Sequence, residues 1–237
     1  MLNFLNHNPF PVAAYFRRSL VLTYSCPPEA LRPLLHPGLD LDTWQDHAFL
    51  AVAMVQTENL HPTFLPAAFG RDFFLSGHRI FVRHGSQRGL QILRSDTDKP
   101  SMVRLGNLFT RYHYRLCRFD LAPAAGGALW TVRTPTADAD VEVLEHDTEA
   151  PSLPPGSVFT TEREARRFAG PLPVTYARDE SSAALFAVRA IRQDWSPRLV
   201  PVDVRRNTFL PGGARLAAAF AVRNVAYRWM AGTRCAA

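Results

Sequence analysis

The residues with the clearest chemical potential follow a predicted helix, SMVRLGNLFTR (101–111). We expect the chain to be extended after it, which puts Arg111, His113 and Arg115 on one side. Two guanidinium groups beside an imidazole lower its pKa by repulsion between like charges. A neutral imidazole can act as a general base or as a hydrogen-bond partner. His113 is therefore the candidate catalytic residue; the alternative is a core histidine bonded to a carbonyl.

Other reactive arrangements are absent from the sequence. It contains no H-E-x-x-H, no G-x-S-x-G and no glycine-rich phosphate loop. His78 and His84 share a strand face, but six residues of strand separate them by about 20 Å, too far to bind one metal. The three cysteines, Cys26, Cys117 and Cys235, form no C-x-x-C pair. We predict no metal site, no cofactor and no disulfide framework.

Lysine chemistry is nearly excluded by composition. Lys99 is the only lysine among 27 lysine and arginine residues. Arginine cannot form the imine that a lysine amine forms with a ketone. Asp96 and Asp98 stand close to Lys99 in the sequence, and neighbouring carboxylates raise an ammonium pKa, which disfavours a nucleophilic amine.

The charge and hydropathy patterns limit the partners. The net charge is +6, but the arginines are scattered and form no long basic run, so we expect no nucleic-acid partner. The sequence contains no run of about 18 apolar residues, so we expect no membrane span. The N-terminus lacks the basic start of a signal peptide. Unpaired cysteines favour a reducing, cytoplasmic setting. A homo-oligomer remains an open alternative.

Most segments are typical of strands. Residues 19–25, 48–58, 73–85 and 89–96 are rich in strand-forming residues, and the last two are predicted to be joined by a turn. Short helices are predicted at 27–35, 101–111 and 162–169, the second with Asp98 or Ser101 as its cap. Residues 149–157 read as a polar loop, not as a domain boundary. We therefore expect one domain over residues 1–237.

The segment ARLAAAFAVRNVAYRWM (214–230) is ambiguous. Its alanines favour a helix by propensity. Its large apolar residues alternate instead, with a period of two that favours strands. We predict strand, with a break near Asn224.

Two separated motifs carry a resemblance to a known family. RRSLVLTYSCPPEALRPLL (17–35) resembles the opening of acetoacetate decarboxylase, and LGNLFTRYHYRL (105–116) resembles the segment that carries its paired lysines. The YRW at 227–229 is similar to the strand end of an uncharacterised, YqjF-like branch of that superfamily. The resemblance implies a mostly β fold with a few short helices, an antiparallel cone-shaped β-barrel around a central cavity.

The resemblance also implies where the site lies and what it lacks. The two lysine positions hold His113 and Tyr114, so the nucleophile and its tuning partner are both missing. The family's glutamate ahead of the strand is also absent from FFLSGHRIFV (73–82). Arg17 falls at the family's first-strand arginine, although Arg18 is one register step away. We predict that Arg17, Arg111, Tyr114 and Arg115 bind a substrate.

The sequence thus predicts a small-molecule-binding cavity protein, with an anionic ligand as one candidate. It could be a lyase-type enzyme that acts on a carbonyl or carboxylate compound by acid–base chemistry, not a Schiff-base decarboxylase. A non-catalytic ligand-binding or structural protein on the same scaffold is the alternative, because a fold alone does not determine function.

Overall fold

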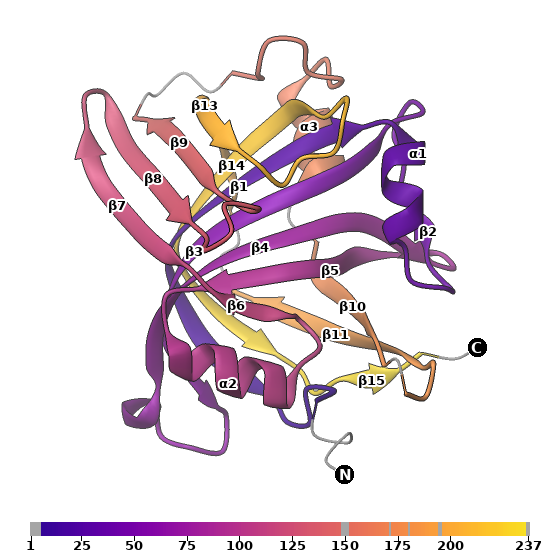
Figure 1. The fold of residues 1–237 in the computed structure, drawn as a ribbon, viewed down its shortest axis with the longest axis vertical. Helices are drawn as coiled ribbons and strands as arrows, with labels where there is room; N and C mark the ends of the chain where they lie inside the picture. Colours follow the sequence, from indigo (N-terminus) through magenta and orange to yellow (C-terminus); the bar gives the residue numbers. More distant parts are fainter. Residues whose placement is uncertain (1–5, 148–151, 171, 180, 194–195, 236–237) are drawn as a thin grey trace.

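The computed structural model describes residues 6–147, 152–170, 172–179, 181–193 and 196–235, and is built mainly from strands (Figure 1). Its elements, in chain order, are β1 (Val12–Cys26), α1 (Pro28–Leu31), η1 (Arg32–Leu34), β2 (Asp40–Leu41), β3 (Ala48–Pro62), η2 (Ala67–Phe69), β4 (Arg71–His84), β5 (Gln87–Thr97), α2 (Pro100–Phe109), β6 (Tyr114–Leu116), β7 (Arg118–Ala124), β8 (Gly127–Arg133), β9 (Val141–His146), α3 (Glu162–Ala169), β10 (Val174–Arg178), β11 (Leu185–Arg192), β12 (Arg198–Leu199), β13 (Val202–Asn207), β14 (Arg215–Trp229) and β15 (Thr233–Arg234).

The larger of two sheets closes on itself. Its strands follow the order β14-β1-β3-β4-β5-β10-β11, and β11 pairs again with β14 to complete a ring. All neighbours in the ring are antiparallel except β5 and β10, which are parallel over two residue pairs, Thr175 with Leu90 and Tyr176 with Gln91. The mostly β, mostly antiparallel fold that the resemblance implies is thereby confirmed, with this one parallel pairing.

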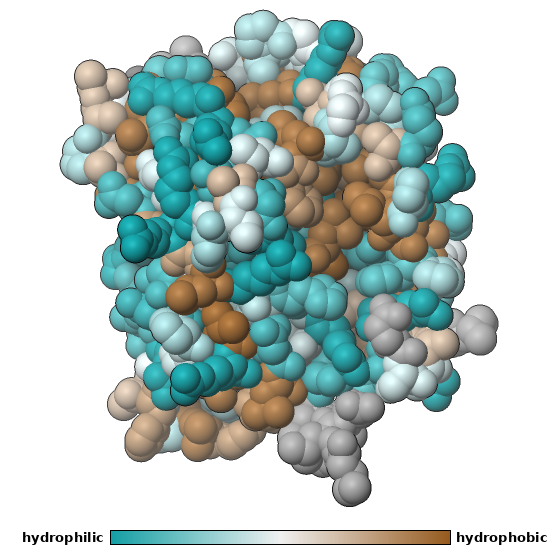
Figure 2. Space-filling model, in the orientation of Figure 1, coloured by the Kyte–Doolittle hydropathy of each residue, from teal (hydrophilic) through white to brown (hydrophobic). Residues whose placement is uncertain are grey.

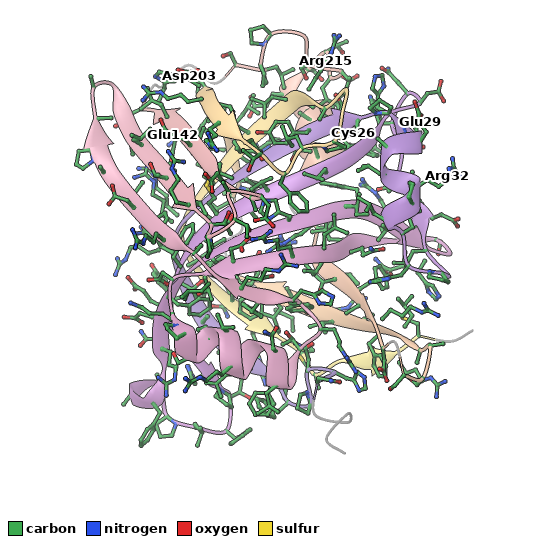
Figure 3. The ribbon with its side chains drawn as sticks, in the orientation of Figure 1. Cys26, Glu29, Arg32, Glu142, Asp203 and Arg215 are labelled. Atoms are coloured by element: carbon green, nitrogen blue, oxygen red, sulfur yellow. The ribbon has the colours of Figure 1, made fainter. Side chains whose placement is uncertain are left out.

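A four-stranded antiparallel sheet, β13-β9-β8-β7, covers part of the outside of the ring (Figure 1). In Figure 3, Glu142 on β9 and Asp203 on β13 mark this sheet, and Glu29 and Arg32 mark the α1 side. One cluster of buried residues lies between the ring and these outer elements, with Trp130 and Leu31 among its fully buried members.

A buried carboxylate joins the two sheets. Glu145 on β9 is 2% exposed, accepts a hydrogen bond of 2.8 Å from the indole of Trp130, and pairs at 2.8 Å with Arg18 on β1. The Arg18 guanidinium also lies over the Trp130 ring. Arg18 therefore contributes to sheet packing on the outside of the ring.

A second buried cluster fills one end of the ring's inner face. Phe49, Phe81 and Phe159 pack there with Phe168 of α3. α3 begins with a capping box, in which Thr161 and Glu164 exchange hydrogen bonds, and this confirms the helix predicted at 162–169. Aromatic rings thus close this end of the ring.

The ambiguous alanine-rich segment is the single strand β14, as the period of two predicts. It pairs with β1, β11 and β12, and these hydrogen-bonded ladders outweigh helix propensity. The break expected near Asn224 is a local change only: Asn224 has a φ of 57° within a continuous strand.

The hairpin predicted at 73–96 is confirmed as β4 and β5, with Gly85 in the left-handed region at a φ of 57°. α2 is confirmed too, but its predicted caps are wrong. Lys99 is the N-cap residue and has no side-chain cap bond, and Asp98 accepts a hydrogen bond from the backbone N–H of Phe74 instead.

Most of the visible surface is hydrophilic (Figure 2). Hydrophobic side chains gather in two places, toward the upper right of the view and at the lower end, where the β3–β4 loop and α2 lie. Phe64, Phe69 and Leu108 are exposed in these last two segments. No helix in the described part of the chain is long and apolar enough to cross a membrane.

Candidate functional site

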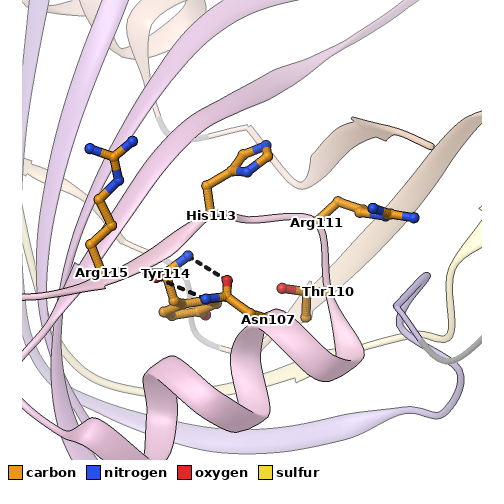
Figure 4. A pocket seen from close by; sticks show the side chains of 6 residues that line it. All are labelled: Asn107, Thr110, Arg111, His113, Tyr114 and Arg115. Atoms are coloured by element: carbon orange, nitrogen blue, oxygen red, sulfur yellow. Dashed lines mark hydrogen bonds between the residues drawn. The ribbon is translucent and has the colours of Figure 1, made fainter. Parts of the chain in front are cut away.

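The structure brings four of the five predicted site residues together at the C-terminal end of α2. A pocket of about 340 Å³ is lined by Asn107, Thr110, Arg111, His113, Tyr114 and Arg115. Figure 4 shows the His113 and Arg115 side chains extending to one side of the chain, whereas the Tyr114 ring lies against α2. We refer to this site as the α2–β6 pocket.

Asn107 sets the geometry of the pocket. Its side-chain amide donates to the Tyr114 carbonyl at 2.9 Å, and its side-chain oxygen accepts from the Tyr114 backbone N–H at 2.8 Å (Figure 4). These two bonds imitate a strand pairing and hold the start of β6 against the helix. Gly106 allows the close approach, because a Cβ there would meet the Tyr114 ring at 2.3 Å.

The chain between α2 and β6 is not extended as the sequence predicts. His113 has a φ of 53°, in the left-handed region, and its side chain is exposed. The turn exchanges the side chains that face inward and outward. Tyr112 and Tyr114 are partly buried, and His113 faces the α2–β6 pocket instead of the ring interior. The predicted interior position of His113 is therefore corrected to a surface position.

Each guanidinium at the pocket has one carboxylate partner. Arg111 Nη2 donates to Asp179 Oδ1 at 2.7 Å, and Arg115 Nη1 lies 3.5 Å from Asp138 Oδ2. Burial raises the pKa of Asp179, but hydrogen bonds from Ser182 and Ser181 and the charge of Arg111 bring it down to about 2. Hydrogen bonds from Arg94 and Thr136 also lower the pKa of Asp138, so both carboxylates are ionised at neutral pH and hold the arginines in place.

Arg17 is not near this pocket. Its side chain is 58% exposed and its Nε lies 2.9 Å from Glu58 Oε1 on the neighbouring strand β3. The structure thus places neither Arg17 nor Arg18 in the ring interior, since Arg18 faces the four-stranded sheet. Lys99 is half-exposed, lies 3.3 Å from Asp98 and does not line the α2–β6 pocket.

A buried polar cluster lies on the outer face of β4 and β5. Arg94 forms two 2.9 Å bonds to Asp96 and a 2.6 Å ion pair with Asp138. His78 is fully buried and packs at a tilt against Phe209, with the ring centroids 4.2 Å apart. Neither of its ring nitrogens has a hydrogen bond to a described residue. Burial first, and then the charges of Arg94 and Arg79, lower the pKa of His78 to about 3. His78 is thus a neutral core residue.

That His78 and His84 do not bind a common metal ion stays a prediction. Among the described residues, no group of three or more His, Cys, Asp and Glu side chains is placed to hold one. The buried thiol of Cys117 is unreactive by the same physics, since burial raises its pKa to about 12.

Sequence reasoning missed Arg79, which lies on β4 between Gly77 and Phe81 of the inner strand face. It donates no hydrogen bond and forms no ion pair with any described residue, and its Nε is buried. The available signal was an arginine inside the apolar run SGHRIFV (76–82), where a charge is costly without a partner.

The fold is that of the acetoacetate decarboxylase-like proteins. Acetoacetate decarboxylase from Legionella pneumophila has a TM-score of 0.64 at 12% identity, covering 98% of this chain and 90% of that one. An acetoacetate decarboxylase-like enzyme from Sphingomonas wittichii RW1 has a TM-score of 0.61 at 16% identity, covering 98% and 94%. The enduracididine biosynthesis enzyme MppR, complexed with pyruvate, has a TM-score of 0.59 at 12% identity, covering 95% and 90%.

Within this fold, the chain belongs to the family DUF2071, described as an uncharacterized conserved protein (COG2071), whose model matches residues 13–222. The resemblance noted from the two sequence motifs is confirmed. A search of curated proteins finds no match.

Proposed function

We propose that the chain binds a small organic acid in the α2–β6 pocket, and that any reaction there is acid–base chemistry at His113. The observation that carries the proposal is that His113, Arg111 and Arg115 all line one pocket large enough for such a molecule. The carboxylates hold each arginine on one side, which leaves other guanidinium N–H groups to bind an anion.

Imine chemistry has little support in this chain. A Schiff base needs an amine at the reacting carbon, and the lone lysine lies outside the pocket beside a carboxylate. The proposed enzyme therefore differs in mechanism from a lysine-dependent decarboxylase. The pyruvate complex of MppR supports a keto acid as a first probe, on the strength of the shared fold alone.

The experiment is titration with pyruvate, using Arg115→Gln and His113→Asn as test variants and Arg104→Gln as the matched control. Arg104 lies exposed on α2 and does not line the pocket. Arg115→Gln should weaken binding by about 1.5–3 kcal/mol, the scale of a hydrogen bond to a charged group. Equal affinity of Arg115→Gln and the control would refute a ligand in this pocket.

Turnover separates an enzyme from the alternative, a non-catalytic binding protein on the same scaffold. If a keto acid is converted, His113→Asn should reduce turnover by about 10²–10⁴ while retaining binding, as expected for a general acid–base residue. Borohydride should trap no adduct with pyruvate. A ketone-dependent adduct on Lys99 would overturn the exclusion of imine chemistry.

A further inference from the structure

The interior of the ring holds a positively charged group, Arg79, that is separate from the arginines of the α2–β6 pocket. Arg79 shares its strand face with Gly77 and Phe81, because side chains alternate along β4. Phe81 belongs to the inner cluster with Phe49 and Phe168. Tyr227 of β14 is close enough to influence the charge of Arg79, although β1 and β3 separate their strands in the sheet. The alternation along β4 puts Arg79 on the same inward face as Phe81.

Arg79 differs from Arg94 and Arg18, two arginines that lie on the outer face of the ring. Arg94 is paired with Asp96, and Arg18 is paired with Glu145. Arg79 has no carboxylate within ion-pair distance among the described residues and donates to none of their acceptors, and its Nε is buried. An unpaired guanidinium in a desolvated place is costly to folding, and such groups persist where a ligand supplies the missing charge.

Small residues on β3 and β4 accommodate this guanidinium. A Cβ added at Gly77 would meet Arg79 Nη2 at 3.0 Å, so the group lies directly over that glycine. Ala51 is the strand neighbour of Arg79, and Ala53 is the strand neighbour of Gly77. The Arg79 side chain keeps some accessible surface even though burial lowers its pKa. That combination is expected of a side chain that lines an internal space.

Three tyrosines contribute to the electrostatics of Arg79. Tyr112 and Tyr114, like Tyr227, lie within electrostatic range of Arg79. The Tyr112 hydroxyl is engaged with Thr175 at 3.0 Å, whereas that of Tyr114 makes no hydrogen bond with a described residue. Burial raises the pKa of Tyr114, so its phenol keeps its proton and can donate.

We propose that Arg79 anchors a binding site inside the ring for a small monocarboxylate, with the Tyr114 phenol as a second donor. The planar guanidinium matches a carboxylate in a bidentate geometry. A single negative charge is favoured because one guanidinium neutralises it, whereas a phosphate dianion would leave a charge buried without compensation. The stacked rings of Phe16 and Tyr227, with Trp229 beside them, offer an apolar wall for the rest of the ligand.

This inference does not require the α2–β6 pocket to bind anything. The test measures thermal stability and affinity with pyruvate, acetate and benzoate, and with phosphate and chloride as comparison anions. The variants are Arg79→Met, which keeps length and removes the charge, and Tyr114→Phe, which removes one hydroxyl. Arg71→Met is the matched control, since Arg71 is exposed at the start of the same strand.

Without ligand, Arg79→Met should melt at the same or a higher temperature than the wild type, because it removes an unpaired buried charge. It should also weaken monocarboxylate binding by at least about tenfold, and Tyr114→Phe by about two- to tenfold. The control should match the wild type. The same loss should appear in an Arg115→Gln background, which separates this site from the α2–β6 pocket.

Three results would overturn the inference. The first is a ligand-free Arg79→Met that is clearly destabilised, which would make Arg79 a structural residue. The second is binding that Arg115→Gln removes and Arg79→Met leaves intact. The third is a response to chloride or phosphate equal to that for carboxylates, which would show a general effect of salt.

Discussion

The buried imidazole of His78 makes the stability of this protein depend on pH in a calculable way. Its pKa is about 3 in the folded chain, against 6.5 for an unperturbed histidine, which is the value expected in the unfolded chain. Below pH 6.5 the histidine is protonated in the unfolded chain but stays neutral in the folded chain. The contribution of His78 to the free energy of unfolding is therefore fully present above pH 6.5 and is lost as the pH falls toward 3. Each pH unit below 6.5 lowers the free energy of unfolding by about 1.4 kcal/mol, which gives a loss of about 2 kcal/mol between pH 7 and pH 5.

His78→Leu should remove this loss. Leucine has a similar volume, suits the contact with Phe209 and carries no titrating group. Chemical denaturation at pH 7 and pH 5 measures the effect: the free energy of unfolding of the variant, relative to the wild type, should rise by about 2 kcal/mol at the lower pH. In a protein of this size that is a difference in melting temperature of about 4–8 °C.

His78→Gln separates titration from polarity. It should lose the same pH dependence but be less stable than His78→Leu at pH 7, because an amide would be buried without partners. Asp96 lies 3.8 Å from His78 and is present in all three proteins, so its own titration largely cancels in the comparison. Parallel pH profiles of the wild type and His78→Leu would refute the assignment of a neutral, desolvated imidazole.

Two further substitutions test the packing that supports the site. Gly106→Ala should destabilise the chain by about 1–3 kcal/mol, since the added Cβ would meet the Tyr114 ring at 2.3 Å. The control Gly212→Ala should be nearly neutral, because a Cβ at that position meets no other atom. Equal denaturation midpoints of the two variants would contradict the close contact at Gly106. Glu145→Gln should cost about 1–3 kcal/mol by leaving Arg18 without its buried counter-charge, measured by urea denaturation, and a neutral result would remove that ion pair from the account of sheet packing.

Most of the secondary structure could be predicted from the sequence because its patterns are local. The period of two in 214–230 identified β14 despite its alanines, and the glycine at position 85 placed the β4–β5 turn. The antiparallel ring, in contrast, came from the family resemblance. No local pattern specifies the parallel pairing of β5 with β10, which lie about 80 residues apart in the chain.

The candidate site was predictable only as a neighbourhood. The motif predicted that residues 111–115 lie together at the central cavity, whereas in the structure they lie together at a surface pocket, because one left-handed residue, His113, decides which side chains face inward. A single non-glycine residue with positive φ carries no reliable sequence signal. The predicted position of Arg17 at the site was wrong for another reason. Its partner Glu58 on β3 is 41 positions away in the sequence, and the pairing can be recognised only once the register of the two strands is known.

The short parallel pairing between β5 and β10 also bears on how the chain folds. The strands from β3 to β5 are joined by short connections and can pair early, whereas β10 must return from far along the chain to meet β5. Gly89 permits that meeting, because a Cβ there would strike the Tyr176 ring at 2.5 Å and the Val174 carbonyl at 2.9 Å. We expect this junction to form last and to open first, so that amide hydrogen exchange is faster at Thr175 than in the middle of β3.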